Sequence, residues 1–352
     1  MTAKRVTLAD VAAHAGTSTA VVSYVLNDGP RPVSEALRAK VLRALDELQY
    51  RPDRIARALR RPGRWRQIGL LVPDLTLPLF GTLVGRIELE ARRRDHLTLI
   101  GNTGYDPDRE LEFVEAFAGS GIDGLIVVGG ANGPATAKVC ARERIPIVWA
   151  HNNRDHVDSP LVGADHVAAG ALAARHLLEA HGRREIAFVG GFTAEDVVHG
   201  DRETVAQRHA GYATVVGAAD ARVVRTDLTP HGAYASVIRY LATEPAPRGM
   251  VVGTYGQAAA VLRAIADSGL RTPEDIAVVG FDADARNSFG QPVLTTVQQP
   301  IDVIARAALD RILSPATAAT PVVDVRLETG ETCGCGIDPM SSRNHRLAAG
   351  TL

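Results

Sequence analysis

The sequence is poor in cysteine and in aromatic residues, and it contains no long hydrophobic run. Its 352 residues include three Cys, and Phe, Trp and Tyr together make up 5%. Three cysteines are too few for the disulfide framework that small secreted domains use. No apolar run reaches the roughly 18 residues of a transmembrane helix, and the first ten residues, MTAKRVTLAD, lack the apolar core of a signal peptide. We therefore expect no membrane association and a cytoplasmic location.

Two of the cysteines, Cys333 and Cys335, lie close together near the C-terminus, whereas Cys140 is isolated. A C-x-C pair could bind a metal, but it supplies only two of the four ligands that zinc usually takes. We therefore expect no metal site. Residues 333–352 have no hydrophobic periodicity and are predicted to form a disordered tail.

The motifs that most often mark nucleotide-binding and hydrolytic enzymes are absent. The sequence has no G-x-G-x-x-G that opens a helix after a strand, no Walker A motif and no G-x-S-x-G elbow. His151 and Asp282 could form an acid–base pair, but no nucleophile or metal cluster accompanies them. We therefore expect neither an enzyme nor a cofactor.

The net charge of −1 combines two regions of opposite charge. Residues 1–66 contain 13 Lys and Arg against 6 Asp and Glu, a net charge of +7, and the remaining residues contain 26 against 34, a net charge of −8. A basic N-terminal region on an acidic body indicates an anionic partner that is bound at one end only. A solvated basic linker would show the same charge balance.

Residues 7–50 are predicted to form three helices. Thr7 can cap the first helix, with Asp10 completing a capping box, and Gly16 can end it because glycine readily adopts a positive φ. Thr17 or Ser18 can cap a second helix that runs to Val25. Ser34 can cap a third helix, whose apolar face carries Leu37, Val41, Leu45 and Leu48. Two short helices joined at a glycine are the helix-turn-helix pattern.

The second predicted helix carries the side chains that base reading requires. A helix in the major groove presents small or hydrogen-bonding groups to the base edges, while helix termini hold phosphates. The residues of this kind are Ser18, Thr19, Ala20, Ser23, Tyr24 and Asn27. A three-helix packing module without a DNA role is the alternative interpretation.

Residues 51–66, RPDRIARALRRPGRWR, form an arginine-rich segment. Its arginines recur every three to four residues at Arg54, Arg57, Arg60 and Arg64, which is one face of a helix. Such a segment repels itself in isolation, but it can fold when its charges are neutralised by phosphates. We predict a segment that can fold as it binds phosphates.

Between residues 67 and 332, short β-rich runs alternate with stretches of helical length. The runs are IGLLVPD, LTLIGNT, GLIVVGG, IPIVWAHN, EIAFVGG, GMVVGTY and IAVVGFD. This alternation predicts parallel sheets covered by helices on both faces. Seven or more strands in about 260 residues fit two sheets better than one.

Several longer segments occur in an order typical of one protein family. They are VTLADVAAHAGTSTAVVSYVLN, RPDRIARALR, GIDGLIVVGG, RHAGY, EDIAVVGFD and LTTVQQP, within about residues 5–330. The sequence resembles the lactose/galactose-repressor (LacI/GalR) family of bacterial transcription regulators. The resemblance implies an all-α helix-turn-helix headpiece, a hinge helix and an α/β two-lobed core like a type I periplasmic binding protein. It also implies a homodimer on a pseudo-palindromic operator in double-stranded DNA.

The resemblance assigns DNA-binding roles to individual positions. The residues that it implies contact the DNA backbone are Thr7, Ser18 and Asn27. The positions where the family reads bases are Thr19, Ala20, Ser23 and Tyr24. The implied hinge contacts are Arg54, Arg57, Ala58 and Leu59. Leu59 matches the leucine that wedges between base pairs in the minor groove. Tyr24 stands where many members have arginine, and Asp53 where asparagine is frequent, so the operator sequence is left open.

The resemblance also assigns a ligand cleft, at the carboxyl ends of strands where two-lobed α/β proteins bind ligands. The cleft residues are Leu79, Phe80, His151, Arg208, Asp227, Thr254 and Asp282. Arg208 can donate two hydrogen bonds to a carboxylate or to adjacent hydroxyls, and Asp282 can accept from ligand hydroxyls. Asp227 falls where an aromatic side chain often stacks on the ligand, so we expect a sugar or related metabolite without that stacking contact.

Together these patterns predict a sequence-specific DNA-binding regulator, a repressor whose operator affinity depends on a small-molecule effector. The predicted domains are a helix-turn-helix domain over 1–50, a hinge over 51–66, the core over 67–332 and the tail. A pure solute-binding protein, the other non-enzyme candidate, would need an export signal and would have no use for the basic N-terminal region.

Overall fold

The computed structural model describes residues 6–27, 33–48, 50, 66–131, 133–151, 160–192, 202–283, 289–290, 292–314 and 322–335. The chain divides into two compact units, residues 1–65 and 66–352. We call the first unit the headpiece and the second the core. The predicted hinge, 51–66, lies outside the described residues except for Arg66.

In the residues of the headpiece that the structure describes, 6–27, 33–48 and 50, there are three helices, as predicted for residues 7–50. They are α1 (Leu8–His14), α2 (Thr19–Asn27) and α3 (Glu35–Glu47). Their apolar faces meet in a small core around Val11, Val22 and Val41, none of which is exposed to solvent. The turn between α1 and α2 contains Gly16 with φ +64°, a conformation that glycine adopts without steric cost.

The predicted helix caps are partly confirmed. Thr7 and Asp10 form the complete capping box of α1. Ser34 occupies the N-cap position of α3 as expected, but its side chain makes no capping hydrogen bond. The second helix runs two residues beyond the predicted end at Val25, to Asn27, because nothing in the intervening sequence stops it.

The core contains two α/β lobes. The first lobe comprises β1 (Gln67–Val72), α5 (Pro78–Arg93), β2 (Leu97–Asn102), α6 (Pro107–Ser120), β3 (Gly124–Val128), α7 (Gly133–Glu143), β4 (Ile147–His151), β5 (Leu161–Ala164), α12 (Ile301–Leu313) and β11 (Val322–Val323). The second comprises α8 (His166–Arg175), the π-helix η1 (His176–Ala180), β6 (Ile186–Gly191), α9 (Arg202–Val216), β7 (Arg222–Arg225), α10 (Pro230–Thr243), β8 (Gly249–Val252), α11 (Tyr255–Asp267), β9 (Ala277–Phe281), β10 (Thr295–Gln298) and β12 (Arg326–Glu328). All seven predicted β-rich runs form strands at their expected positions.

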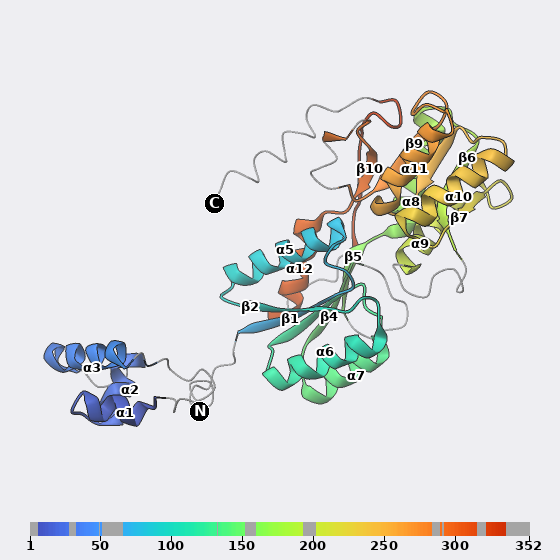
Figure 1. Cartoon of the computed structure of the whole chain (residues 1–352). Helices are drawn as coiled ribbons and strands as arrows, with labels where there is room; N and C mark the ends of the chain where they lie inside the picture. Colours follow the sequence, from blue (N-terminus) through green and yellow to red (C-terminus); the bar gives the residue numbers. More distant parts are fainter. Residues whose placement is uncertain are drawn as a thin grey trace. The chain divides into compact units, whose positions relative to one another are not determined.

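Each lobe of the described core is built on one six-stranded sheet (Figure 1). The strand orders are β11-β5-β4-β3-β1-β2 and β12-β10-β9-β8-β6-β7. Neighbouring strands are parallel except for β10 and β12, which are antiparallel. The prediction of two parallel sheets is therefore confirmed with one antiparallel exception at an edge.

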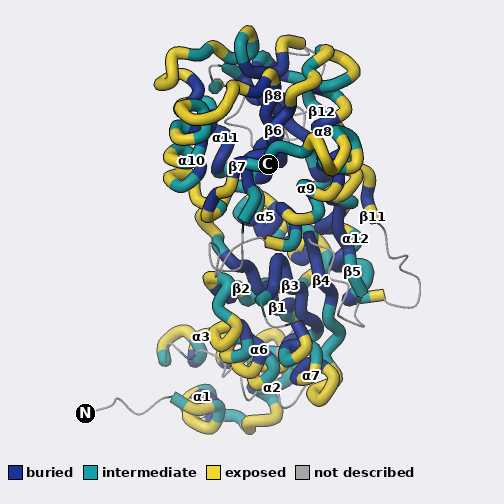
Figure 2. Tube along the Cα trace, turned by 90° about the vertical axis from the view of Figure 1, so that its right-hand side faces the viewer, coloured by how far each residue is buried: buried dark blue, intermediate teal, exposed yellow. Residues whose placement is uncertain are grey.

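Helices cover both faces of each sheet, and this explains why the central strands are apolar along their whole length. In the first lobe α5 and α12 pack on one face and α6 and α7 on the other. In the second lobe α10 and α11 share one face and α8 and α9 the other. The central strands β1, β3, β8 and β9 are accordingly buried, and the outer faces of the helices are exposed (Figure 2).

The chain passes between the lobes at three places. It goes from β5 to α8, returns from β10 to α12, and passes again from β11 to β12. We call residues 299–300, between β10 and α12, the crossing segment. These three connections join the two lobes, and each lobe keeps its own sheet.

The disordered tail was predicted to begin at residue 333, but residues 333–335 are folded against the second lobe. Cys333 is 1% exposed, and its sulfur accepts a hydrogen bond from Thr295 Oγ1 at 3.0 Å. Thr332 Oγ1 also donates to the carbonyl of Val278 at 2.7 Å. Residues 331–335 thus pack on the second lobe, and the rest of the predicted tail lies outside the described residues.

Short strands with few apolar residues were not predicted. Strands β5, β7, β11 and β12 have two to four residues each, too few to show a period. No helix within the described part of the chain is both long and apolar enough to cross a bilayer.

Candidate functional site

A concavity on the headpiece brings together the start of α1 and the start of α2. It is lined by Thr7, Leu8, Ala9, Thr19, Ala20, Ser23 and Tyr24. Because Val22 and Val25 are buried in the headpiece core, the polar positions of α2 remain at the surface. All four residues predicted to read bases therefore lie on one accessible surface, which we call the headpiece concavity.

Thr7 and Ser18 lie at the N-terminal ends of α1 and α2. The Thr7 backbone N–H and hydroxyl donate to Asp10 Oδ2 at 2.8 and 2.6 Å. Ser18 Oγ accepts from the N–H of Val21 at 3.4 Å. Helix N-termini carry unpaired N–H groups and a partial positive charge, so both positions suit contact with a phosphate.

Five predicted DNA contacts are not described in full. Asn27 is the last residue of α2, but its side chain lies outside the described residues. The hinge contacts Arg54, Arg57, Ala58 and Leu59 also lie outside them. Their roles remain predictions.

In the core, Arg208 and Asp282 form a buried ion pair. Arg208 Nη2 lies 2.5 Å from Asp282 Oδ2, and each side chain is 3% exposed. Arg208 Nη1 donates to the carbonyl of Gly253 at 2.9 Å, and the guanidinium lies 4.1 Å above the Phe281 ring. Two buried charges are tolerated in a protein only when they are paired and hydrogen-bonded. The sequence predicted both residues for the cleft but not that they pair with each other.

Helix α9 holds Arg208 because it crosses α8 at very short distance. A Cβ on Gly170 of α8 would lie 1.9 Å from the Arg208 carbonyl, and one on Gly211 of α9 would lie 1.9 Å from the Val167 carbonyl. Next to Gly211, the hydroxyl of Tyr212 donates to the carbonyl of Ile186 at 2.7 Å. Burial raises the pKa of Tyr212 to about 12, so it remains a neutral anchor for α9.

Gln299, in the crossing segment, joins the buried ion pair to the first lobe. Its backbone N–H and its Nε2 donate to the two oxygens of Asp282, at 3.2 and 3.0 Å. Its Oε1 lies 3.3 Å from His151 Nδ1. A continuous polar chain therefore runs from His151 at the end of β4 through Gln299 to Asp282 and Arg208. The sequence did not indicate a role for Gln299, although the motif LTTVQQP contains it.

His151 is surrounded by aromatic rings of the first lobe and of α8. Its ring lies edge-on to Phe80 at 5.3 Å and to His166 at 5.3 Å between centroids. Both His151 and Asp282 adopt positive φ, +85° and +54°. Non-glycine residues in this conformation are strained and cluster at functional sites. The structure thus places Phe80 and His151 side by side, and their predicted role in effector binding stays a prediction.

The other predicted cleft residues have local roles as well. Thr254 caps α11 and accepts from the N–H of Gln257 at 3.4 Å. Asp227 is exposed, and its Oδ1 accepts from the N–H and hydroxyl of Thr229 at 2.9 and 2.8 Å. Its carboxylate therefore stabilises its own loop.

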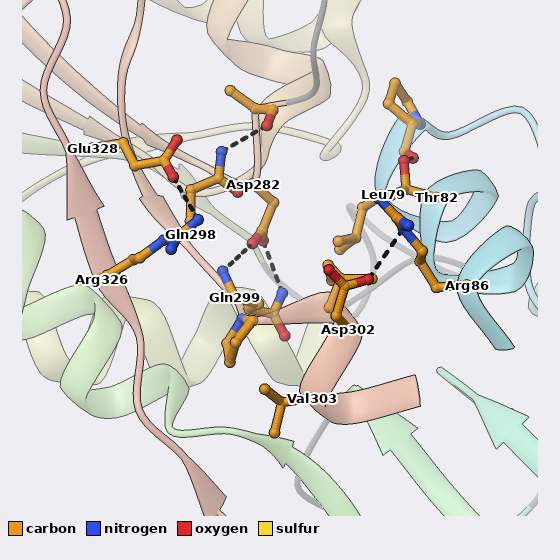
Figure 3. Close-up of a pocket in the computed structure, with 14 residues that line it drawn as sticks. Leu79, Thr82, Arg86, Asp282, Gln298, Gln299, Asp302, Val303, Arg326 and Glu328 are labelled. Carbon is orange, nitrogen blue, oxygen red and sulfur yellow. Dashed lines mark hydrogen bonds and ion pairs between the residues drawn. The ribbon is translucent and has the colours of Figure 1, made fainter. Parts of the chain in front are cut away.

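A cavity of about 390 Å³ lies where α5 faces the crossing segment and β12 (Figure 3). Leu79 of the first lobe and Asp282 of the second both line it. Arg86 of α5 forms an ion pair with Asp302 at 3.1 Å across the lining. The volume is within the range of small-molecule sites, and the lining combines apolar side chains with a buried carboxylate.

Comparison with known proteins agrees with the two-unit architecture. Residues 7–53 match the family model described as bacterial regulatory proteins, lacI family, and residues 174–333 match a periplasmic binding protein-like domain. The HTH-type transcriptional repressor PurR of Erwinia tasmaniensis is 30% identical over 321 residues, which covers 89% of this chain and 91% of that protein. The chain belongs to the LacI family of bacterial regulatory proteins.

Solved structures of LacI-family members have the same fold. A lac repressor dimer bound to operator and the anti-inducer ONPF superposes with a TM-score of 0.79 at 26% identity, covering 94% of this chain and 99% of that chain. A LacI-family regulator from Enterococcus faecium with bound ribose gives a TM-score of 0.64 at 25% identity, covering 76% and 98%. The predicted fold class is confirmed, and these LacI-family relatives are transcriptional regulators rather than enzymes.

Proposed function

We propose that this chain is a transcriptional repressor that binds a pseudo-palindromic operator as a homodimer and is controlled by a small-molecule effector. The headpiece concavity is the observation that carries the proposal. It places Thr19, Ala20, Ser23 and Tyr24 side by side on the second helix of a helix-turn-helix, beside the N-terminus of the first. Bacterial operators are in the cytoplasm, and we place the protein there.

The proposed DNA contacts follow from the chemistry of the groove. Hydroxyls of Thr19 and Ser23 can donate to or accept from base edges, and Ala20 can contact a thymine methyl group. Thr7 and Ser18, at helix N-termini, suit the phosphates on either side. The predicted hinge residues Arg54, Arg57, Ala58 and Leu59 and the end of α2 at Asn27 extend this proposed footprint.

The proposed effector is a sugar or a related metabolite held between the lobes. The lac repressor structure named above contains ONPF and the Enterococcus faecium regulator contains ribose. In this chain, Asp282, Arg208 and His151 would form the hydrogen bonds with such a ligand. Phe80, Leu79, Thr254 and Asp227 complete the proposed site.

The effector would act by favouring one arrangement of the lobes. A ligand shifts an equilibrium only by the difference between its affinities for the two states. The polar chain His151–Gln299–Asp282 spans both lobes, so a ligand that contacts its ends would change the relative free energies of lobe arrangements. In a dimer this would change the spacing of the two headpieces and hence operator affinity.

An enzyme is the alternative. His151 and Asp282 are both buried, but each is bonded to Gln299, and we assign the pair to ligand control rather than to catalysis. Incubation of the purified protein with sugars and nucleosides, followed by product analysis, separates the two: turnover would support an enzyme.

The DNA-binding proposal is tested by selecting duplexes from a randomised pool with the full chain. We expect a palindromic site that the full chain binds far more tightly than a fragment ending near Arg66, because the dimer links two headpieces. Equal affinities of fragment and full chain for that site would contradict the dimeric mode. Recovery of no consensus sequence would contradict operator binding.

A further inference from the structure

Four potential metal ligands converge on the second lobe, at residues separate from the proposed effector site. They are His176, His181, Cys333 and Cys335, and their ligand atoms all lie within 4.8 Å of one another. The Nε2 atoms of the two histidines are 3.2 Å apart. Cys335 Sγ lies 3.2 Å from His181 Nε2 and 3.7 Å from His176 Nε2.

These separations match the corners of a zinc site. Zinc binds sulfur at about 2.3 Å and nitrogen at about 2.0–2.1 Å with tetrahedral geometry, so its ligand atoms lie roughly 3.3–3.8 Å apart. The three distances above are close to that range. Two thiolates and two neutral imidazoles also balance the charge of Zn²⁺, which suits a site whose members are partly buried.

The histidines converge because the helix changes its winding at this point. Helix α8 passes into the π-helix η1, which begins at His176 and ends just before His181. In a π-helix residue i bonds to residue i+5, so side chains five positions apart lie on the same side. His176 and His181 are five positions apart, and their rings meet at 4.8 Å between centroids. Single π-turns of this kind occur frequently at functional sites.

The two cysteines converge because a glycine lies between them. Gly334 has φ +100°, a conformation that other residues rarely adopt. A Cβ at this position would be 3.8 Å from His181 Nδ1, so the turn packs directly against that ring. Cys333 Sγ accepts hydrogen bonds from Thr295 Oγ1 at 3.0 Å and from the N–H of Cys335 at 3.5 Å, contacts that stabilise a thiolate and orient it.

We propose that His176, His181, Cys333 and Cys335 bind one zinc ion. Four protein ligands fill a tetrahedral site, so the ion has a structural role and no open position for a substrate. It would fasten residues 331–335 to the end of α8–η1. The sequence predicted no metal because the C-x-C pair supplied two ligands, and the other two come from a segment more than 150 positions earlier.

Metal content tests the proposal directly. The reduced full-length protein is stripped with a chelator, reloaded with Zn²⁺, dialysed and assayed by atomic emission. We expect one zinc ion per chain. The exposed ligand Cys335 is changed in Cys335→Ser, which should fold normally and lose zinc affinity by more than about tenfold, since even residues behind metal ligands contribute that much. His181→Ala should behave in the same way.

Two variants outside the cluster serve as controls. Cys140→Ala removes a buried thiol of the first lobe, and His231→Ala removes an exposed histidine of α10. Both should keep one zinc ion per chain. Because metal binds preferentially to the folded state, Zn²⁺ should also raise the unfolding temperature of the wild type and of both controls, and that of Cys335→Ser by less.

Cobalt(II) reports the geometry of the site. Substitution of Co²⁺ into the wild type should give the intense visible bands of tetrahedral cobalt and sulfur-to-metal charge-transfer absorption, both weaker in Cys335→Ser at the same Co²⁺ concentration. A weak spectrum typical of six-coordinate cobalt would overturn the proposal. So would a Cys335→Ser variant that binds zinc with wild-type affinity, or a Cys333–Cys335 disulfide that mass spectrometry still detects after treatment with a reductant.

Discussion

At the scale of single residues, the buried Arg208–Asp282 pair has the strongest energetic consequences. Each charge is removed from water, and the hydrogen bonds within the pair and with Gly253 and Gln299 compensate for part of the lost hydration. Removing one member of such a pair leaves the other buried and unpaired, which costs more than the pair itself contributes.

Arg208→Met is therefore expected to lower the free energy of unfolding by about 3–5 kcal/mol. Adding Asp282→Asn in the same chain should recover part of that loss, because the uncompensated charge is gone. Urea denaturation of the wild type, both single variants and the double variant gives the coupling energy. Strictly additive effects would show that the two side chains do not interact.

Tyr24 is the residue whose substitution should change the preferred DNA sequence. It lines the headpiece concavity next to Ala20 and Ser23, and an arginine there can make a bidentate contact with guanine. Tyr24→Arg should shift the operator preference by roughly 1–3 kcal/mol per altered base contact while binding persists. Selection from a randomised duplex pool measures this, and an unchanged consensus would place Tyr24 outside the reading surface.

The sequence predicted Arg208, Asp282, Phe80 and His151 because a resemblance maps residues onto positions of a known fold. It missed Gln299, which matters because its side chain forms hydrogen bonds with Asp282 and His151, residues 17 and 148 positions away in the sequence. The same limit applies to the histidine–cysteine cluster. Such sites form only when the folded chain brings distant residues together, so no spacing in the sequence predicts them.

At the scale of elements, the crossing of α8 and α9 determines where Arg208 lies. The crossing depends on Gly170 and Gly211, where any side chain would overlap the backbone of the other helix. Helices approach this closely only when small residues lie at the contact, as small residues do in other tightly packed helix pairs.

Gly170→Ala should therefore destabilise the core by about 1–3 kcal/mol or more through overpacking. Gly119→Ala is the matched control: Gly119 lies in α6 and is exposed, and a Cβ added there would meet no neighbouring atom within 4 Å. The control should be neutral or stabilising by about 0.5–1 kcal/mol, since alanine favours helix. Thermal unfolding of the two variants compares them, and equal stabilities would contradict the role of the crossing.

Elements with a strong period were predictable and short ones were not. The seven apolar runs formed strands because strands buried on both faces must be apolar throughout. Strand β7 (Arg222–Arg225) has arginine at both ends and lies at the edge of its sheet, so its sequence carries little signal. The π-turn at His176 has no sequence pattern that distinguishes it from a continuing α-helix.

At the scale of the whole molecule, the crossing segment connects the two lobes of the core through hydrogen bonds. Gln299 contacts Asp282 of the second lobe and His151 of the first. Its neighbour Gln298 donates to the carbonyl of Ala283 at 2.6 Å, within the second lobe. The two adjacent glutamines therefore differ in whether they connect the lobes.

Gln299→Met keeps the side-chain volume and removes the side-chain hydrogen bonds between the lobes. We expect it to shift the effector concentration needed for a half-maximal change in operator binding by about tenfold, since each lost hydrogen bond contributes about 0.5–1.5 kcal/mol. Gln298→Met should shift it much less. A dose–response series of operator binding for both variants measures the difference, and equal shifts would rule out coupling through Gln299.

The central claim is tested most directly by the affinity of the full chain for its selected operator, measured with and without compounds that bind the core. Binding compounds are first identified among sugars and nucleosides by their effect on the unfolding temperature of the core. We expect at least one of them to change the operator dissociation constant by about 5–150-fold, the usual range of coupling between two sites. Sequence-specific binding that no core-binding compound alters would contradict ligand control by the two-lobed core.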